Sequence, residues 1–501
     1  MKQVGLMVIF LGGLLIGFCP GLSAQTAPAS KEANTFYDRG LAYFNQNRYE
    51  DAIAEFSRAI NLNSKNPLYF FRRAWAKERN HDLSGALTDY TRAIELDPNY
   101  ASAYSARGVV KDRQRDFKGA LADYNRAIEL KAPRQSQSTF FSNRAELKYR
   151  MEDYEGALAD VNQAIELNPD AARLYTIRGY MKLKKDNVEG ALADYSRALE
   201  IDPKLSLAHY HRGQVKVRNK DSNGALTDFN RAIELDPRLT IAYVSRGRLK
   251  EGLSDSEGAL RDYNKAIEFN PLSSGAFNFR GYLKEKQGDS TGALKDYSQA
   301  IALDPQGVWS AYYNRGVIRF KNKELVEALK DFNQAILINP KNSGSFRNRG
   351  EIKMELGDFS GALVDFNRAI EISPKNHRAY TARGELREKR GDLEGALADF
   401  NQAIELDPKY APAYAERAEI KIARTDYPGA MADLMKALEL EPGNDEASGR
   451  IKEVRDLMAK EGRMKKEKVK TPPVVKRPRK TRSVKLEAVV PEDRPTAFGP
   501  K

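Results

Sequence analysis

Apolar residues recur along most of this chain at helical spacing, in paired segments separated by short polar turns. In residues 393–406 they form one stripe, made of Leu393, Ala396, Leu397, Phe400, Ala403, Ile404 and Leu406. A shorter segment of the same kind, residues 378–389, precedes it. Between the two, Gly391 suits the positive φ of a helix C-terminus and Asp392 suits the cap of the next helix. Pro408 ends the second segment because proline lacks the N–H that a helix needs. The pattern predicts two helices joined by a tight turn.

This two-helix pattern repeats, and one arginine marks each copy. The landmark arginines are Arg39, Arg73, Arg107, Arg144, Arg178, Arg212, Arg246, Arg280, Arg315, Arg349, Arg383 and Arg417. Their spacing is 34 residues, except for 37 residues before Arg144 and 35 before Arg315. We therefore expect twelve copies of one unit over residues 34–442.

Small residues indicate how the two helices of a copy meet. Alanine opens the apolar stripe of every second helix, at Ala52, Ala86, Ala120, Ala157, Ala191, Ala225, Ala259, Ala293, Ala328, Ala362, Ala396 and Ala430. The residue after each landmark arginine is always glycine or alanine, so the two backbones can approach closely. Such a hairpin cannot bury its outer apolar side alone and must stack on the next copy. We expect an all-α fold, an α-solenoid of stacked helix pairs.

The unit resembles the tetratricopeptide repeat. The resemblance is carried by the 34-residue period, by Gly384, Ala396 and Ala403, and by the closing Pro408. It covers more than four-fifths of the chain and is specific for fold, whereas members of the family serve as binding scaffolds in many unrelated settings.

In that family the peptide groove is lined by the first helices, near the position of the landmark arginine. The resemblance therefore implies a set of partner-binding residues that vary between copies: Phe71, Arg72, Trp75, Tyr180, Tyr210, His211, Phe279, Tyr282, Tyr313, Asn314, Arg347 and Asn348. Each of these side chains has packing between helices as its alternative role. Only Arg347 and Asn348 correspond to part of the clamp with which some relatives grip a C-terminal carboxylate.

The first residues differ from the repeats. Lys2 precedes a 15-residue apolar run over residues 4–18, which is shorter than the roughly 20 residues of a membrane span. We interpret residues 1–24 as a secretory signal cleaved near Ala24, with an uncleaved anchor as the alternative. The protein is then exported, to the periplasm or the exterior, and its mature form holds no cysteine because Cys19 is the only one. Residues 25–33 are expected to be a linker.

Two further segments depart from the repeat pattern. Residues 131–138 add three residues to one copy, and we favour a tolerated loop insertion over a bend between the flanking copies. Residues 443–463 carry apolar positions at helical spacing and are expected to form a helix that caps the last copy.

The net charge of +13 is concentrated near the C-terminus. Residues 463–485 hold eleven Lys or Arg and one Glu, a balance of +10, so the rest of the chain carries about +3 (13 − 10). We expect residues 464–501 to be a basic, disordered tail. Its densest part, Lys476, Arg477, Arg479, Lys480 and Arg482, favours polyanions such as anionic lipid or an envelope polymer over nucleic acid, and the alternative is a tail that only aids solubility.

A charged pattern also recurs inside the copies. An acid follows each landmark arginine by sixteen residues, Glu55 in the first copy and Asp in the others, and a second base follows by four residues in eleven copies. We favour a structural ion pair over a row of anion sites, because a feature present in every copy fits a shared architectural need.

Signatures of an enzyme are missing from the sequence. The histidines His81, His209, His211 and His377 form no helical metal-binding pair, and phosphate-binding loops and Gly-x-Ser-x-Gly are absent. We therefore expect no catalysis, no cofactor and no metal. The leading hypothesis is an exported scaffold that binds partner proteins or peptides in its groove. The alternatives are a polyanion or membrane-surface binder that acts through its tail, and an accessory subunit that feeds substrate to an enzyme.

Overall fold

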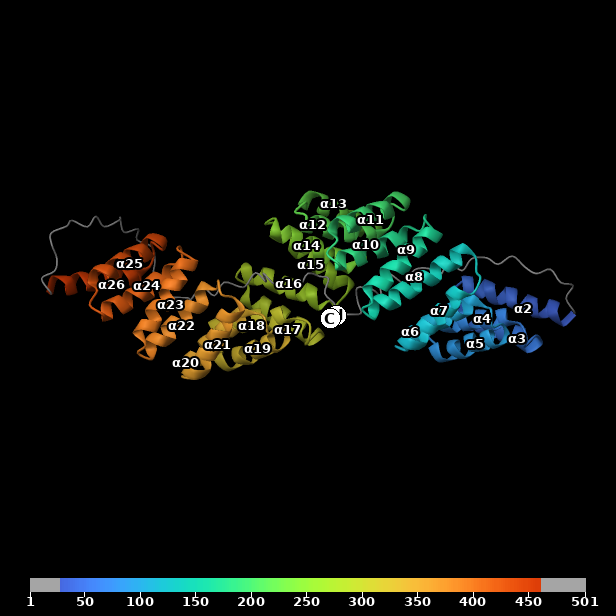
Figure 1. Cartoon of the computed structure of the whole chain (residues 1–501), viewed down its shortest axis with the longest axis horizontal. Coiled ribbons are helices and arrows are strands. Elements are labelled where there is room, and N and C mark those ends of the chain that lie inside the picture. The colour runs from blue at the N-terminus through green and yellow to red at the C-terminus, as the bar shows by residue number, and fades with distance from the viewer. Residues whose placement is uncertain (1–27, 461–501) are drawn as a thin grey trace. The chain divides into compact units, whose positions relative to one another are not determined.

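The computed structural model of the protein describes residues 28–460 (Figure 1). The expected signal segment, residues 1–24, and the basic tail, residues 464–501, lie outside the described residues. Within residues 28–460 the chain forms helices and turns only. These helices belong to two compact units, and the boundary between the units falls between Leu249 and Lys250.

The first unit contains the helices of copies one to six and most of α14. Its helices are α2 (Pro28–Asn45), α3 (Tyr49–Leu62), α4 (Pro67–Arg79), α5 (Leu83–Leu96), α6 (Ala101–Arg113), α7 (Phe117–Glu129), α8 (Arg134–Arg150), α9 (Tyr154–Leu167), α10 (Ala172–Lys184), α11 (Val188–Ile201), α12 (Ser206–Arg218), α13 (Ser222–Leu235) and α14 (Thr240–Gly252).

The second unit contains the remaining helices. They are α15 (Ser256–Phe269), α16 (Ser274–Lys286), α17 (Ser290–Leu303), α18 (Trp309–Lys321), α19 (Leu325–Ile338), α20 (Ser343–Glu355), α21 (Phe359–Ile372), α22 (His377–Lys389), α23 (Leu393–Leu406), α24 (Ala411–Ala423), α25 (Tyr427–Leu440) and α26 (Asp445–Lys460). Each predicted copy thus corresponds to two consecutive helices, and the predicted all-α fold of tandem helix pairs is confirmed.

The turn inside each pair has the backbone and the cap that the sequence predicts. Gly391 adopts φ +79°, and the Asp392 carboxylate accepts a hydrogen bond of 2.9 Å from the Gly395 amide. A Cβ atom on Gly395 would lie 2.1 Å from that carboxylate, which explains a glycine three residues after the cap. In other copies non-glycine residues take the left-handed conformation, among them Thr425 at φ +62°.

Close packing inside a pair depends on the small residues. All twelve alanines that open the second helices are fully buried. A Cβ atom on Gly384 would lie 2.6 Å from the Phe400 ring, so the ring fills the space that glycine leaves. In two of the three copies with alanine after the landmark arginine, the ring is replaced by Val161 or Leu434.

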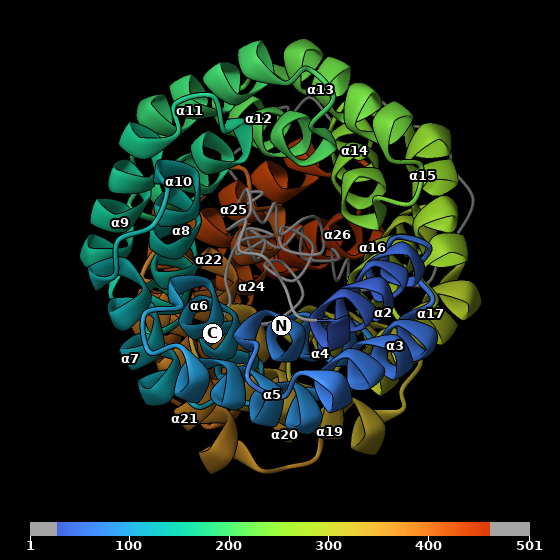
Figure 2. The ribbon, with the colours of Figure 1, turned by 90° about the vertical axis from the view of Figure 1, so that its right-hand side faces the viewer.

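Within each unit the first helices of successive copies approach one another. Such contacts join α4 to α6, α6 to α8 and α10 to α12, and, in the second unit, α16 to α18, α18 to α20, α20 to α22 and α22 to α24. In the first unit, α8, α10 and α12 lie on the inside of the curve, while α9, α11 and α13 lie on the outside (Figure 2). We call the side formed by the first helices the inner face.

The landmark arginine joins three helices. Arg383 of α22 donates from Nε and Nη2 to both carboxylate oxygens of Asp399 on α23, at 2.9 and 2.7 Å. Its Nη1 donates to Asn367 on α21, in the preceding copy, at 2.8 Å. The guanidinium also lies over the Tyr380 ring, 5.5 Å from its centroid. The Nε, Nη1 and Nη2 atoms of Arg383 therefore each donate to another residue of the protein.

The same bidentate contact recurs through both units. It joins Arg73 to Asp89, Arg107 to Asp123, Arg144 to Asp160, Arg178 to Asp194, Arg212 to Asp228, Arg280 to Asp296, Arg315 to Asp331, Arg349 to Asp365 and Arg417 to Asp433. In the first copy Arg39 reaches Glu55 at 3.2 Å. The structure thus favours the structural ion pair over a row of anion sites.

The aspartate also receives the second base of the pattern. Arg387 Nη1 lies 2.8 Å from Asp399, and Lys284 Nζ lies 2.8 Å from Asp296. Burial raises the pKa of Asp296, but hydrogen bonds from Arg280 and Lys284 outweigh it, so the net pKa lies below its usual value. The carboxylate therefore stays ionised and paired at neutral pH.

The three-residue addition before Arg144 lengthens a helix, so our expectation of a loop insertion is wrong. The helix α8 has 17 residues, four more than α6 or α10. Pro133, with φ −53° and ψ 147°, directly precedes this helix, because proline is tolerated at a helix start but not in its interior. The Gln137 side chain then donates a hydrogen bond to the Leu130 carbonyl at the end of α7. At the other end of the unit, α2 begins at Pro28, inside the segment that we expected to be a linker.

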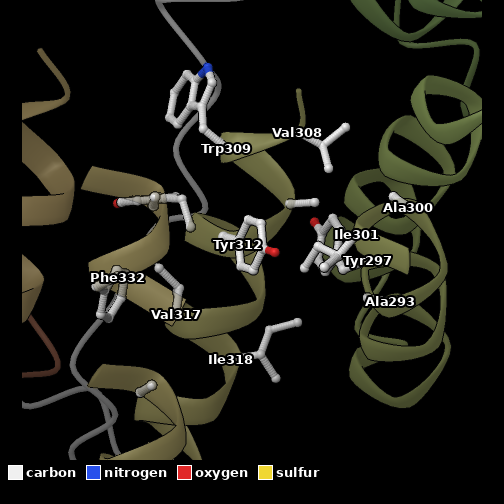
Figure 3. Close-up of a cluster of buried hydrophobic side chains, with 14 of the residues drawn as sticks. Ala293, Tyr297, Ala300, Ile301, Val308, Trp309, Tyr312, Val317, Ile318 and Phe332 are labelled. Carbon is white, nitrogen blue, oxygen red and sulfur yellow. The ribbon is translucent and has the colours of Figure 1, made fainter. Parts of the chain in front are cut away.

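Rings and aliphatic side chains from consecutive helices form the core between copies. In the largest cluster Tyr297 of α17, Val317 of α18 and Phe332 of α19 are buried together with Trp309 (Figure 3). At the end of the second unit Ala447, Ile451 and Val454 of α26 pack on Ala430, Leu434 and Ala437 of α25. Thus α26 covers the apolar side of α25 that no further copy covers.

Replacing Arg383 tests the ion pair. We expect Arg383→Met to lower the free energy of local opening in α22 and α23 by roughly 2–3 kcal/mol, because Asp399, whose side chain is 4% exposed, keeps only Arg387. The double substitution Arg383→Met with Asp399→Leu should cost clearly less, since an apolar pair replaces a buried charge.

Hydrogen exchange read by mass spectrometry measures this opening helix by helix. Arg368→Met is the control, because Arg368 forms an exposed pair with Glu371 and its loss should change stability by less than about 0.5 kcal/mol. A double variant less stable than Arg383→Met would contradict the structural role.

Replacing Thr425 tests the turn. A β-branched residue at positive φ is strained, so Thr425→Gly should stabilise the α24–α25 hairpin by about 1 kcal/mol. The reverse change at the matching position, Gly391→Thr, should destabilise the α22–α23 hairpin by a similar amount. Hydrogen exchange of the two hairpins measures both, and equal protection in all variants would refute the expectation.

Candidate partner-binding face

The residues that we expected to bind a partner lie on the first helices, and most of them are buried. Nine have exposed fractions of 9% or less: Phe71, Tyr180, Tyr210, His211, Tyr282, Tyr313, Asn314, Arg347 and Asn348. The other three, Arg72, Trp75 and Phe279, are half-buried. The structure gives many of these side chains a contact within the protein, and their role toward a partner stays a prediction.

Aromatic rings form diagonal contacts across successive first helices of the first unit. The rings of Phe44 and Trp75 lie 4.4 Å apart, those of Tyr149 and Tyr180 lie 5.6 Å apart, and those of Tyr180 and His211 lie 5.7 Å apart. The two residues of each pair are 31 positions apart, which places them on neighbouring first helices. Aromatic side chains therefore line part of the inner face of this unit.

In the second unit, several contacts between neighbouring first helices are polar. Asn348 of α20 donates to the Tyr313 hydroxyl of α18 at 3.1 Å. Asn278 of α16 donates to Ser310 of α18 at 3.0 Å. Arg347, which we named as part of a carboxylate clamp, is bound to Glu351 at 2.6 Å. This contact occupies the arginine within its own helix.

One predicted pair keeps unused hydrogen-bonding capacity. The Arg72 guanidinium lies over the Trp75 ring, 5.3 Å from the centroid. Its Nε is buried and has no hydrogen-bond partner in the described structure. An incoming peptide can contact the half-buried Trp75 ring and, beside it, the positive charge of Arg72.

Sequence reasoning missed a row of basic residues on the inner face. The sixth residue after the landmark arginine is basic in five consecutive copies of the first unit, at Arg79, Arg113, Arg150, Lys184 and Arg218. We call these five residues the basic row. Their recurrence at the repeat period was the signal in the sequence that could have found them.

Ion pairs between neighbouring copies place Arg113 and Arg150 between successive first helices. Arg113 Nη1 of α6 lies 3.0 Å from the carboxylate of Glu78 on α4, and that carboxylate also accepts from the Tyr90 hydroxyl at 3.1 Å. Arg150 of α8 contacts Asp112 of α6 in the same way. Each of these arginines therefore reaches back from one first helix to the preceding one. Arg79 instead contacts Tyr49 at the start of α3, and Arg218 contacts Asp186 in the turn before α11.

Burial changes the ionisation of the acids around Arg113. Desolvation raises the pKa of Glu78, although Arg113 and the Tyr90 hydroxyl oppose the change. Desolvation also raises the pKa of Glu146 to about 8, and Arg113 opposes it only in part. Burial thus favours the neutral form of Glu146, which weakens its contribution against the positive charge of the basic row.

Other kinds of site receive no support from the described residues. Residues 28–460 contain no group of three His, Cys, Asp or Glu side chains arranged to hold a metal ion. None of their helices has the length and apolar character needed to cross a membrane.

Comparison with known families identifies the repeat. Sequence models described as "Tetratricopeptide repeat" match residues 143–206, 207–239, 309–342 and 347–411, and one described as "TPR repeat" matches 40–80, 82–114 and 281–323. Among curated proteins, none matches this sequence.

Solved structures with low sequence identity are also similar to this chain. The APC/C hetero-tetramer Cut9–Hcn1 aligns at a TM-score of 0.48 and 14% identity, covering 84% of this chain and 96% of that chain. Yeast Tom70 aligns at 0.35 and 18% identity, covering 86% and 96%. A tetratricopeptide repeat protein from Parabacteroides merdae aligns at 0.39 and 20% identity, covering 50% and 98%.

The family assignment rests on the sequence matches, which fall in both units and coincide with the helix pairs described above. The landmark arginine and the buried alanines recur at the same places in all of these pairs, and the closing proline recurs in ten of the twelve. The chain is built of tetratricopeptide repeats.

Proposed function

We propose that this protein is an exported scaffold that holds partner proteins or peptides on the inner face of its tetratricopeptide repeats. The observation that carries the proposal is the composition of that face. It combines a shared framework of buried alanines and landmark arginines with side chains that differ from copy to copy. A constant framework with a variable surface is what a recognition scaffold requires.

The contrast between the two faces supports this assignment. On several second helices, bases and acids three residues apart pair within one helix, as Arg92 does with Glu95 and Arg231 with Glu234. Aromatic rings and cations that reach between copies lie on the inner face instead, where binding energy concentrates in aromatic residues and arginine.

Export is part of the proposal and rests on the sequence of residues 1–24. The competing function, binding of polyanions through residues 464–501, rests on the charge of +10 in residues 463–485. Both segments lie outside the described residues, so an experiment must separate the inner face from the tail.

Site-specific photo-cross-linking tests the proposal in the native compartment. A photoreactive amino acid replaces Phe279 or Trp75, which are half-buried on first helices. In the controls it replaces Leu337 or Val364, which lie on second helices and are 70% and 66% exposed. We expect cross-links to a discrete partner from the first two positions only.

Deleting residues 464–501 gives the second arm of the test. Inner-face cross-links should survive this deletion and should persist at about 0.3 M salt, where exposed charges more than a few ångströms apart are screened. Cross-links that disappear with the tail, or that arise equally from Leu337 and Val364, would overturn the proposal and favour the polyanion binder.

A further inference from the structure

We propose that the basic row of the first unit, Arg79, Arg113, Arg150, Lys184 and Arg218, receives acidic side chains of an extended partner segment, one acid per repeat. The inference deepens the proposed function and rests on it, because it names the chemistry of the partner. It concerns the first unit alone.

The basic row is continuous in the first unit only. At the matching position the copies of the second unit carry Gly252, Lys286, Lys321, Glu355, Lys389 and Ala423. A glycine, a glutamate and an alanine interrupt the bases there. Copies two to six of the first unit therefore present one cation each, whereas the first copy carries Asn45 at this position.

Three arginines of the basic row, Arg113, Arg150 and Arg218, are partly exposed beside their acidic partners. The Arg113 side chain is 51% exposed, and its contact with Glu78 uses one of five N–H donors. Arg218 is 49% exposed, and its contact, Asp186, is itself 79% exposed. Such exposed pairs contribute little energy, so an incoming carboxylate can share or replace them. Arg150 is 33% exposed beside Asp112.

Tyrosine rings lie beside the other two members of the row. Arg79 donates to the Tyr49 hydroxyl at 3.3 Å and lies over the Tyr49 ring. Lys184 Nζ lies 5.6 Å from the centroid of the Tyr180 ring. A carboxylate bound at these two places would also rest beside an aromatic surface. Burial lowers the pKa values of Lys184 and Arg150, which is the direction expected for cations that an anionic ligand would stabilise.

The repeat interval selects the spacing of the acids. Axes of packed helices are about 8–10 Å apart, so neighbouring members of the row are separated by a similar step. A segment in the polyproline II conformation advances about 9.3 Å in three residues. An acid at every third position of such a segment meets one member of the row per copy.

Acidic peptide fits this face better than nucleic acid. One acid per repeat leaves uncharged residues opposite the carboxylates of Glu78, Asp112 and Asp186, which border the row. A nucleic acid strand carries a phosphate on every nucleotide, and its surplus phosphates would meet those carboxylates. The charge pattern of the row therefore matches sparse, regularly spaced acids.

Fluorescence anisotropy with the full chain tests the inference. The probe is a labelled peptide of repeated Glu-Pro-Ala units, long enough to span the basic row. The controls are a peptide of the same composition with its glutamates clustered, a peptide of Lys-Pro-Ala units, and an oligothymidine of equal length. We expect the Glu-Pro-Ala peptide to bind at least about ten-fold more tightly than each control.

Matched variants then locate the binding. The variant Arg79→Ala, Lys184→Ala, Arg218→Ala removes three members of the row and spares Arg113 and Arg150, whose loss would strand buried carboxylates. The control Arg92→Ala, Arg126→Ala, Arg231→Ala removes the same charge from second helices of the same unit, where the side chains are about half exposed. The first variant should weaken peptide binding at least about ten-fold and the control less than about two-fold.

Several outcomes would overturn the inference. They are equal weakening by both variants, tighter binding of the oligothymidine, equal binding of the clustered peptide, or no binding of any probe. Circular dichroism melting shows whether the variants are folded, and the comparison of probes on the unaltered chain does not depend on them. If inner-face positions cross-link to a native partner but the chain shows no preference for the Glu-Pro-Ala peptide, this inference is contradicted and the proposed function is not.

Discussion

The contact between the landmark arginine and its aspartate holds the copies in register. It is bidentate and partly buried, and it fixes both the distance and the orientation of the two helices of a pair. Because the same guanidinium also reaches the preceding copy, as Arg383 reaches Asn367, one side chain sets the geometry within a copy and between copies. The stacking of alanines and rings can then be equally close in every copy. A buried ion pair of this kind adds specificity of arrangement more surely than it adds stability.

The inner face follows from this arrangement. With the landmark arginine directed between the helices, the positions that follow it by five and six residues lie where one first helix meets the next. Acids and bases at these positions pair across copies, as Arg113 does with Glu78. Aromatic rings also contact one another across this junction, as those of Tyr149 and Tyr180 do. The constant framework residues thus fix the positions of the variable side chains, and the sequence of each copy sets the chemical character of those side chains.

Periodicity made the framework predictable from sequence. The bounds 393–406, the left-handed Gly391 and the cap at Asp392 were all expected and are all observed, since each depends on local chemistry repeated many times. The partner-binding residues were harder to place because whether Tyr313 or Asn348 is accessible depends on the neighbouring copy, as their mutual hydrogen bond shows. The three residues added before Arg144 were misplaced for a similar reason. Pro133 reads as a breaker, but at this position it starts a longer helix.

The hairpin of α18 and α19 bears on how the chain acquires its structure during synthesis. Lys323 occupies the left-handed position at its turn, and Glu324 caps α19 without any side-chain hydrogen bond. The backbone of this hairpin is thus weakly encoded by its own residues. The apolar side chains of this hairpin are instead buried in a cluster that extends from Tyr282 of α16 to Ile352 of α20. During synthesis, a nascent chain that includes α19 but not yet α20 therefore lacks part of the apolar core of this hairpin. The hairpin becomes ordered when the following copy packs against it.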